Sequence, residues 1–393
     1  MNVTTVPLLR RVAARDPHEP GRTATPLELL FDLVFVVAIA SNAAQLHHAI
    51  SEHHVMDGIV GYSMSWFAIW WAWMGFTWFA SAYDNDDPLY RVLAFVIMTG
   101  SLMLAAAIPD LFVDGQSVLA VVGYAVMRLG LVALWLRVAT GDPERRALAL
   151  RYAMGITAVQ ALWIVRLWFP SEWWVPTFFL FVACELSVPI WAEGKQGTSP
   201  WHRHHIAERF SLLTIIVLGE VILSSVMAVQ SADVAGWDFL PLVLGGLFLV
   251  YGLWWIYFNL AHHELTDGGA VTWVFAYGHL IIFASIAALG AGLAASVDAL
   301  QGDGHHSDGP AATWVMAVGL ALTALTLAGI HAFAGRNLSI LVSPLLVAGA
   351  ALVVGFIGLP VEWASLAMGL VVVAAVADHV LRRDRVVVAA PLG

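Results

Sequence analysis

The stretch LELLFDLVFVVAIASNAAQLHHA, residues 27–49, decides the fold class of this chain. Only Glu28 and Asp32 interrupt its apolar first half with charge. A membrane-spanning helix needs about 20 predominantly apolar residues. The strand of a membrane barrel is shorter and alternates polar with apolar residues, which this stretch does not do. The stretch therefore predicts a transmembrane α-helix.

The composition extends this prediction to all 393 residues. Hydrophobic residues make up 60% of the sequence and charged residues 12%, with a mean hydropathy of +0.80. Soluble domains have about 45–50% and 25%. The formal net charge of -10 argues against nucleic acid as a partner, because no basic surface can collect phosphates. The single cysteine, Cys184, allows neither an internal disulfide nor a cysteine-based metal cluster.

Eleven further stretches have similar length and composition, so the sequence predicts an all-α, polytopic membrane protein of about twelve spans. Charged residues, glycine, proline or histidine clusters bound each stretch. The predicted spans are Leu27–Ala49, Gly58–Ala82, Leu89–Phe112, Ser117–Ala139, Ala147–Phe169, Trp173–Ala192, Ile206–Val229, Trp237–Ala261, Ala270–Val297, Thr313–Phe333, Leu338–Ile357 and Val361–Leu381.

The basic residues predict the orientation. If the N-terminus is cytoplasmic and the loops alternate, every Lys and Arg except Arg128 and Arg166 lies on the cytoplasmic side. Such an excess of positive charge is typical of cytoplasmic loops. It predicts an even number of spans and two cytoplasmic termini.

Two similar stretches predict an internal duplication. Glu28 opens ELLFDLVFVVAIA, and Glu208 opens ERFSLLTIIVLGE. Two parallel halves of six helices would resemble transporters whose site lies between repeats, although duplication retained only for packing is the alternative. The predicted parts are a cytoplasmic segment 1–26, a first repeat 27–192, a cytoplasmic linker 193–205, a second repeat 206–381 and a cytoplasmic tail 382–393.

Charged residues inside the spans are the candidate functional residues, because a charge at a helix centre costs about 2.5–3.5 kcal/mol. Glu28 and Asp32 are four residues apart and share one helix face. Two such carboxylates favour a bound proton or cation. The positive end of the helix dipole also accounts for Glu28, but it accounts poorly for Asp32, which only apolar residues follow.

Four more residues lie deep in their spans at about 1.5 Å per residue: Arg128, Glu185, Glu220 and His279. One interpretation is an ion pair of Arg128 with Glu185 or Glu220 that only stabilises packing. The other is a carboxylate that binds a proton or cation in transit, with Arg128 as counter-ion. His279 would be a proton relay if it is hydrated, or else a hydrogen-bonded core residue.

The start of the seventh span offers a further contact. Arg209, beside Glu208, is expected to form a gating or inter-repeat ion pair with Glu28 or Asp32. The nearby run WHRHH, residues 201–205, does not place three imidazoles on one helix face, so no metal site is predicted. The tryptophans between residues 66 and 78 favour packing and the membrane interface.

Two motifs resemble a known family. TPLELLFDLVFVVAIASNAAQLHH, residues 25–48, resembles the first signature of the bacterial low temperature requirement protein A (LtrA) family. HHIAERFSLLTIIVLGEVI, residues 204–222, resembles its second signature, HxxERxxLxxIIxLGE. The family name implies a growth requirement in the cold but no substrate and no reaction. The resemblance points to Glu28, Phe31, Asp32, His205, Glu208, Arg209, Gly219 and Glu220.

These observations predict a proton- or cation-coupled secondary transporter or permease in the bacterial plasma membrane. Its expected partners are the lipid bilayer and a proton, small cation or solute; a homo-oligomer and the cofactor stay open. A membrane-embedded enzyme acting on a lipid or cofactor, around His202, His204, His205 and Glu208, is one alternative. A non-transporting sensor or assembly protein is the other. No P-loop, HExxH or GxSxG motif occurs, which argues against ATP drive and these hydrolases.

Overall fold

The structure, a computed structural model, describes residues 10–194, 197–231, 237–260, 269–301, 309–335 and 339–389. Parts of four predicted regions lie outside the described residues: 1–9 of the cytoplasmic segment 1–26, 195–196 of the linker, 232–236, 261–268, 302–308 and 336–338 of the second repeat, and 390–393 of the tail.

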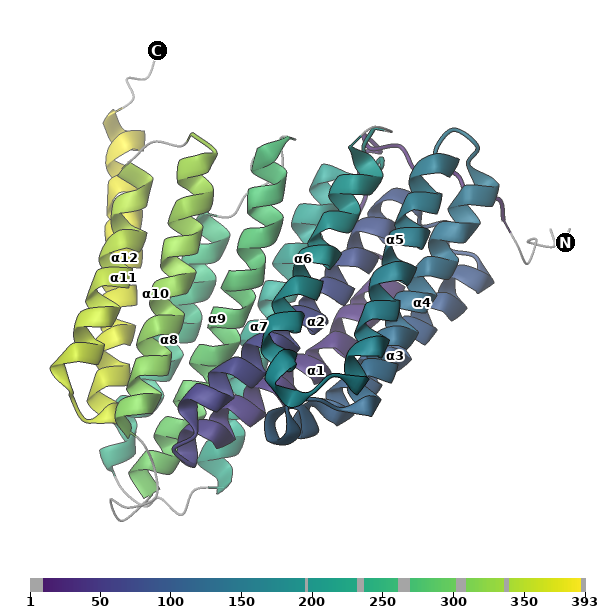
Figure 1. Cartoon of the computed structure of the whole chain (residues 1–393). Helices are drawn as coiled ribbons and strands as arrows, with labels where there is room; N and C mark the ends of the chain where they lie inside the picture. The colour runs from purple at the N-terminus through teal and green to yellow at the C-terminus, as the bar shows by residue number, and fades with distance from the viewer. Residues whose placement is uncertain are drawn as a thin grey trace, which may run out of the picture. The chain divides into compact units, whose positions relative to one another are not determined.

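Twelve α-helices and three short 3-10 helices make up the described chain, which contains no strand (Figure 1). Each predicted span coincides over most of its length with one α-helix, and the all-α class is confirmed for the described residues. The α-helices are α1 Pro26–Ser51, α2 Val55–Tyr83, α3 Pro88–Asp114, α4 Val118–Gly141, α5 Arg146–Val165, α6 Trp174–Glu193, α7 Arg203–Ser231, α8 Leu240–Leu260, α9 Ala270–Gln301, α10 Gly309–Phe333, α11 Ser339–Ile357 and α12 Val361–Ala389. The 3-10 helices are η1 Arg166–Trp168, η2 Ser171–Trp173 and η3 Trp237–Phe239.

Ten of the described helices are long and apolar enough to cross a membrane. The other two are α2 and α11, whose apolar part, Leu341–Ile357, is short. Helix α2 has 29 residues, so its composition and not its length separates it from the ten. The chain is therefore a membrane-type polytopic helical protein. The count of twelve spans, the duplication and the cytoplasmic termini stay predictions.

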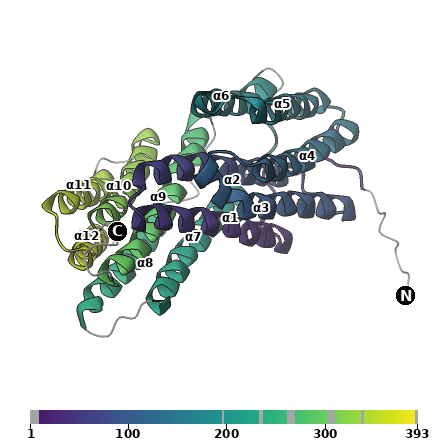
Figure 2. The same cartoon turned by 60° about the horizontal axis from the view of Figure 1, so that its bottom comes forward.

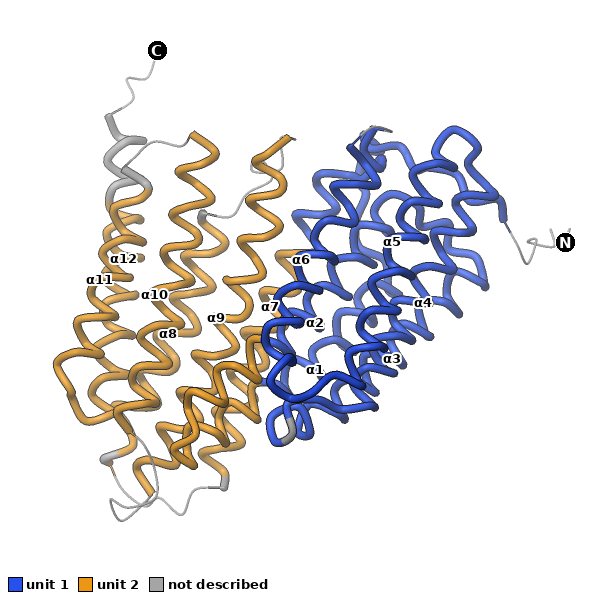
Figure 3. Tube along the Cα trace, in the orientation of Figure 1, with its two compact units in different colours: residues 1–42, 64–209 blue, residues 43–63, 210–393 orange. Residues whose placement is uncertain are grey.

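The helices form two compact units (Figure 3). Unit 1 contains residues 1–42 and 64–209, and unit 2 contains residues 43–63 and 210–393. Helices α1, α2 and α7 therefore contribute to both units. In unit 1, α3 packs on α4, α4 on α5 and α5 on α6, a pair that also lies side by side in Figure 2. In unit 2, α9 packs on α10, α10 on α11 and α8 on α12.

Helix α1 begins with a reciprocal cap. The backbone N–H of Thr25 donates to Oε2 of Glu28 at 2.8 Å, and the N–H of Glu28 donates to the Thr25 hydroxyl at 3.3 Å. Pro26 occupies the first helical position, where its missing N–H costs nothing. This capping box explains why an acid follows TPL, and it fixes Glu28 in the first turn.

The residues before α1, here called the N-terminal segment (residues 10–25), run along helix ends of unit 1. The N–H of Arg15 donates to the carbonyl of Ala82 at the end of α2, at 2.9 Å. The guanidinium of Arg11 donates to the carbonyl of Gly141 at the end of α4, at 2.6 Å. The segment therefore covers the end of unit 1 at which α1 and α7 begin.

Helices α3 and α4 approach each other closely at two glycines. A Cβ on Gly100 would lie 2.6 Å from the carbonyl oxygen of Gly123, and one on Gly123 would lie 2.8 Å from that of Gly100. Both obstacles are backbone atoms, which cannot rotate away. Small residues allow such close packing of membrane helices.

We expect Gly100→Ala to destabilise the protein by about 1–3 kcal/mol, because the new methyl group forces α3 from α4. Gly329→Ala in α10 is the matched control, since a Cβ there meets nothing within 4 Å. Thermal unfolding in detergent micelles measures both variants. A Gly100→Ala protein as stable as Gly329→Ala would contradict the close approach.

Candidate functional site

Four ionisable side chains without exposed surface meet in unit 1: Glu28 and Asp32 from α1, and His205 and Arg209 from α7. Arg209 lies 3.0 Å from Oε1 of Glu28 and donates to both oxygens of Asp32, at 2.5 and 3.2 Å. Nε2 of His205 lies 3.1 and 3.2 Å from the two oxygens of Glu28. Each pair is spaced one helical turn, so the two helices match in register. We call these residues the acid–arginine network.

Aromatic side chains enclose the network. Nε1 of Trp73 donates to Oδ1 of Asp32 at 2.7 Å, and its ring lies 6.0 Å from the Arg209 guanidinium, a cation–π distance. Phe31 stacks on Phe76 with centroids 4.1 Å apart. From the sequence, Trp73 was expected to serve packing or the membrane interface, not to donate to an acid. A signal was present, because a buried acid requires N–H donors and indoles are common in these spans.

Glu208 does not join the network. Its Oε2 accepts a hydrogen bond from the backbone N–H of Ala24, at 3.1 Å, and so holds the N-terminal segment. Arg209 instead meets the two acids of the first motif, the contact expected from the sequence. A gating role for Glu208 and Arg209 stays a prediction.

The histidines of WHRHH take different environments. His202 is buried: Nε2 lies 2.9 Å from the carbonyl oxygen of Glu19, and Nδ1 accepts from the backbone N–H of His205 at 3.2 Å. His204 is exposed. In the described part of the chain, no three His, Cys, Asp or Glu residues are arranged to hold a metal ion.

Asp84 lies at the edge of the network, just after α2, and only 5% of its surface is exposed. Burial raises the pKa of its carboxyl group to about 6, and the negative charge of Glu28 adds to this effect. The guanidinium groups of Arg22 and Arg15 act in the opposite direction. Asp84 is therefore an acid that changes charge close to neutral pH.

A second buried carboxylate, Glu185, also lies in unit 1. Its Oε2 accepts from Arg128 at 2.7 Å and from the indole of Trp71 at 2.9 Å. Its Oε1 accepts from the hydroxyl of Tyr124 at 2.9 Å and the indole of Trp163 at 3.3 Å. The positive charge of the Arg128 guanidinium balances the negative charge of Glu185, and four donors hydrogen-bond the carboxylate. This geometry matches the ion-pair interpretation for Arg128.

The deep residues of unit 2 lie apart from any ion pair. Glu220 is half-buried and makes no hydrogen bond or ion pair with a residue that the structure describes. Nδ1 of His279 lies 2.7 Å from the carbonyl of Phe275, and Nε2 lies 2.9 Å from the hydroxyl of Tyr257. A carbonyl only accepts, so Nδ1 donates and Nε2 accepts from the hydroxyl. These bonds suit a neutral imidazole; a relay role stays a prediction.

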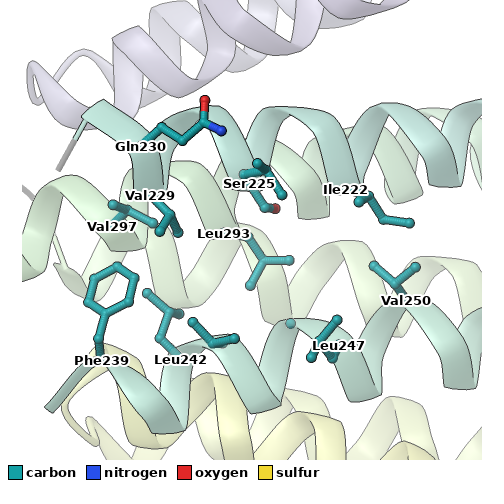
Figure 4. A pocket seen from close by; sticks show the side chains of 13 residues that line it. Ile222, Ser225, Val229, Gln230, Phe239, Leu242, Leu247, Val250, Leu293 and Val297 are labelled. Carbon is teal, nitrogen blue, oxygen red and sulfur yellow. The ribbon is translucent and has the colours of Figure 1, made fainter. Parts of the chain in front are cut away.

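Unit 2 also contains an apolar groove of about 240 Å³ between α7, α8 and α9 (Figure 4). None of the predicted site residues lines it. Its side chains include Ile222, Val229, Leu242, Leu247, Leu293 and Val297.

Comparison with known proteins supports the family that the two motifs resemble. The family model described as "Bacterial low temperature requirement A protein (LtrA)" matches residues 23–377, a range that contains the whole acid–arginine network. A Rhizobium meliloti (strain 1021) protein named "Uncharacterized protein RA0937" is 30% identical over 284 residues. The match covers 66% of this chain and 66% of that protein, so the chain spans just under two thirds of its relative.

We expect Glu185→Gln to destabilise the protein by about 3–5 kcal/mol, because it leaves the Arg128 guanidinium buried without a counter-charge. Glu220→Gln makes the same chemical change at a half-buried acid without an ion pair, and its cost is expected to be about 1 kcal/mol or less. The free energies of unfolding of the two variants in detergent are compared with that of wild type. Equal losses of stability in both variants would show that the Glu185–Arg128 ion pair contributes nothing specific.

Asp84 predicts a pH dependence of stability. The pKa of its carboxyl group is higher in the folded state than the usual 3.8. The protonated carboxyl group therefore stabilises the fold below pH 4, and this stabilisation is lost as the pH rises to about 6. Asp84→Asn cannot ionise, so its stability relative to wild type is expected to increase across this window by about 2–3 kcal/mol. Melting temperatures of both proteins between pH 4 and pH 7 measure the difference. A constant difference would refute the shifted pKa.

Proposed function

We propose that this chain, which belongs to the bacterial low temperature requirement A (LtrA) family, is a secondary transporter coupled to protons or small cations. The acid–arginine network is its coupling site in this proposal, and the bacterial plasma membrane its location. The family and the ten apolar helices support a multi-pass membrane protein. The transport role rests on the charge of the network.

The charge count of the network is the observation that carries the proposal. Glu28 and Asp32 bring two negative charges and Arg209 brings one positive charge, all on side chains without exposed surface. The next charged groups, Arg22 and Asp84, interact with Glu28 at the edge of the network and carry opposite charges while Asp84 is ionised. An uncompensated charge in a low-dielectric interior costs several kcal/mol. The network therefore favours one additional positive charge, which a proton or cation can supply.

The position of the network suits a coupling role. Both α1 and α7 begin at the network and continue into unit 2. Gain or loss of the extra charge changes how Arg209 is shared between Glu28 and Asp32, and with it the pairing of two helices. Alternating access in secondary transporters depends on such shifts between helices. Glu185 is already balanced by Arg128, so we assign it to stability, and Glu220 is a second candidate proton site.

Reconstituted vesicles test this proposal. Purified protein in liposomes with an entrapped pH-sensitive dye is exposed to sodium, potassium, amino acids, organic acids and sugars in turn. We expect at least one solute to change the internal pH in wild-type vesicles. In Asp32→Asn the rate is expected to fall about tenfold or more, because the variant lacks the charge that binds the coupling ion.

The control is Asp86→Asn, which makes the same change at an exposed Asp that pairs with Arg91. It is expected to transport like wild type. If wild-type vesicles respond like empty vesicles to every solute, or if Asp32→Asn transports at the wild-type rate, the proposal is wrong.

A further inference from the structure

We propose that the coupling ion is a proton and that it binds Nδ1 of His205. The role of this proton in transport rests on the proposed function, whereas the proton site on His205 can be tested without it. The charge count shows only that one more positive charge is favoured, and this inference names the ion and the atom that binds it.

The oxygens of the two acids already face N–H groups. Oδ1 of Asp32 accepts from Trp73 and Arg209, and Oδ2 accepts from Arg209. Oε2 of Glu28 accepts from Thr25, and Oε1, which forms no hydrogen bond, lies 3.0 Å from the Arg209 guanidinium. Sodium or a divalent cation requires several oxygen ligands that point toward it. Here it would lie against a guanidinium and an indole N–H, so a metal cation does not fit.

The same donors disfavour a proton on either carboxyl group. A protonated carboxyl needs an acceptor for its O–H, whereas the groups next to these oxygens donate. Protonation of Asp32 would bring its O–H against Arg209 or Trp73. Both acids are therefore expected to stay ionised, and the additional charge must lie on another group.

His205 supplies that group. Its Nε2 lies against both oxygens of Glu28, which only accept, so Nε2 carries a proton. Its Nδ1 is buried and has no hydrogen-bond partner among the residues that the structure describes. In the neutral ring this atom holds an unused lone pair. A proton there makes an imidazolium, and the network becomes neutral: Glu28 and Asp32 against Arg209 and His205.

The neighbouring His202 shows the contrast. Its Nδ1 already accepts from the backbone N–H of His205, and its Nε2 lies at the carbonyl oxygen of Glu19. Its lone pair is used and no carboxylate lies against its ring nitrogens in these bonds.

The charged groups around His205 come from three elements. Burial of the ring opposes the imidazolium most strongly, and Arg22 on the N-terminal segment and Arg209 on α7 also oppose it. Glu28 on α1, which is in direct contact with Nε2, is the group that favours it. Asp84 and Tyr90 also interact with Glu28 and Arg22 at the edge of the network. Removal of the Glu28 charge is expected to make protonation of His205 much harder.

Solid-state NMR of the full chain in lipid bilayers tests the site directly. The histidines carry ¹⁵N in their rings, and spectra are recorded between about pH 5 and 8, where imidazole ordinarily titrates. Coupling from Nε2 to ¹³C-labelled glutamate side chains is expected for His205 and for His48, whose Nε2 lies 3.4 Å from Glu52. His205→Gln removes the His205 signal and so assigns it, and His204→Gln, at the exposed neighbour, is the matched control that keeps it.

We expect His205 to change from the Nε2-protonated ring to imidazolium as the pH falls. In Glu28→Gln the midpoint is expected to move to lower pH by one unit or more, a tenfold or larger loss of proton affinity. Replacement of choline by sodium at constant pH is expected to leave the signal unchanged. A His205 ring that stays neutral while the chain is folded, an unchanged midpoint in Glu28→Gln, or a response to sodium would overturn the inference.

The spectra separate this inference from the transport proposal. If His205 titrates as described and the vesicles show no flux, the proton site stands and the transporter fails. If the vesicles show proton-coupled flux and His205 stays neutral, the transporter stands and the inference is wrong.

Discussion

The guanidinium of Arg209 forms ion pairs with two carboxylates, Glu28 and Asp32, that have no exposed surface. The packing of α1 on α7 in unit 1 depends on these ion pairs. Each acid would be very unfavourable in an apolar helix bundle without a partner. Because Glu28 and Asp32 are one turn apart, only a helix in the correct register and rotation can bring Arg209 to both. The capping box at Thr25 and the indole of Trp73 then hold the acids in place.

The acid–arginine network and the Glu185–Arg128 ion pair, both buried in unit 1, differ in one respect that matters for function. Glu185 and Arg128 balance each other, and four donors complete the carboxylate, so the site has no requirement for another ion. The acid–arginine network has one more acid than guanidinium. A stable structural ion pair and a proton-binding site are thus built from the same residue types, and the charge balance distinguishes them. The two stretches that resemble LtrA family signatures contain all four residues of the unbalanced site.

The sequence predicts some levels of this structure better than others. Long apolar runs identify every helix, because hydropathy is a local property. The pairing of Arg209 with Glu28 and Asp32 was also predictable, because Arg209 opens the seventh predicted span in the stretch that resembles the start of the first span, where the two acids lie. The choice of Glu185 over Glu220 for Arg128 was not, and neither were the indole donors or the bond from Ala24 to Glu208. These contacts depend on how each helix is rotated about its axis, and helices that are apolar on all sides do not reveal that rotation.

The most direct measurement of this account is a double-mutant cycle between Arg209 and Asp32. Unfolding free energies of Arg209→Met, Asp32→Leu and the double variant are compared with wild type in the same detergent. Arg209→Met leaves both acids without their cation, whereas Asp32→Leu leaves Arg209 paired with Glu28 alone. Loss of Arg209 should therefore cost less once Asp32 is absent, and the double variant is predicted to be more stable than the sum of the two losses implies, by about 1–3 kcal/mol. If the two losses simply add, Arg209 does not hold Asp32, and the network on which this account depends does not exist.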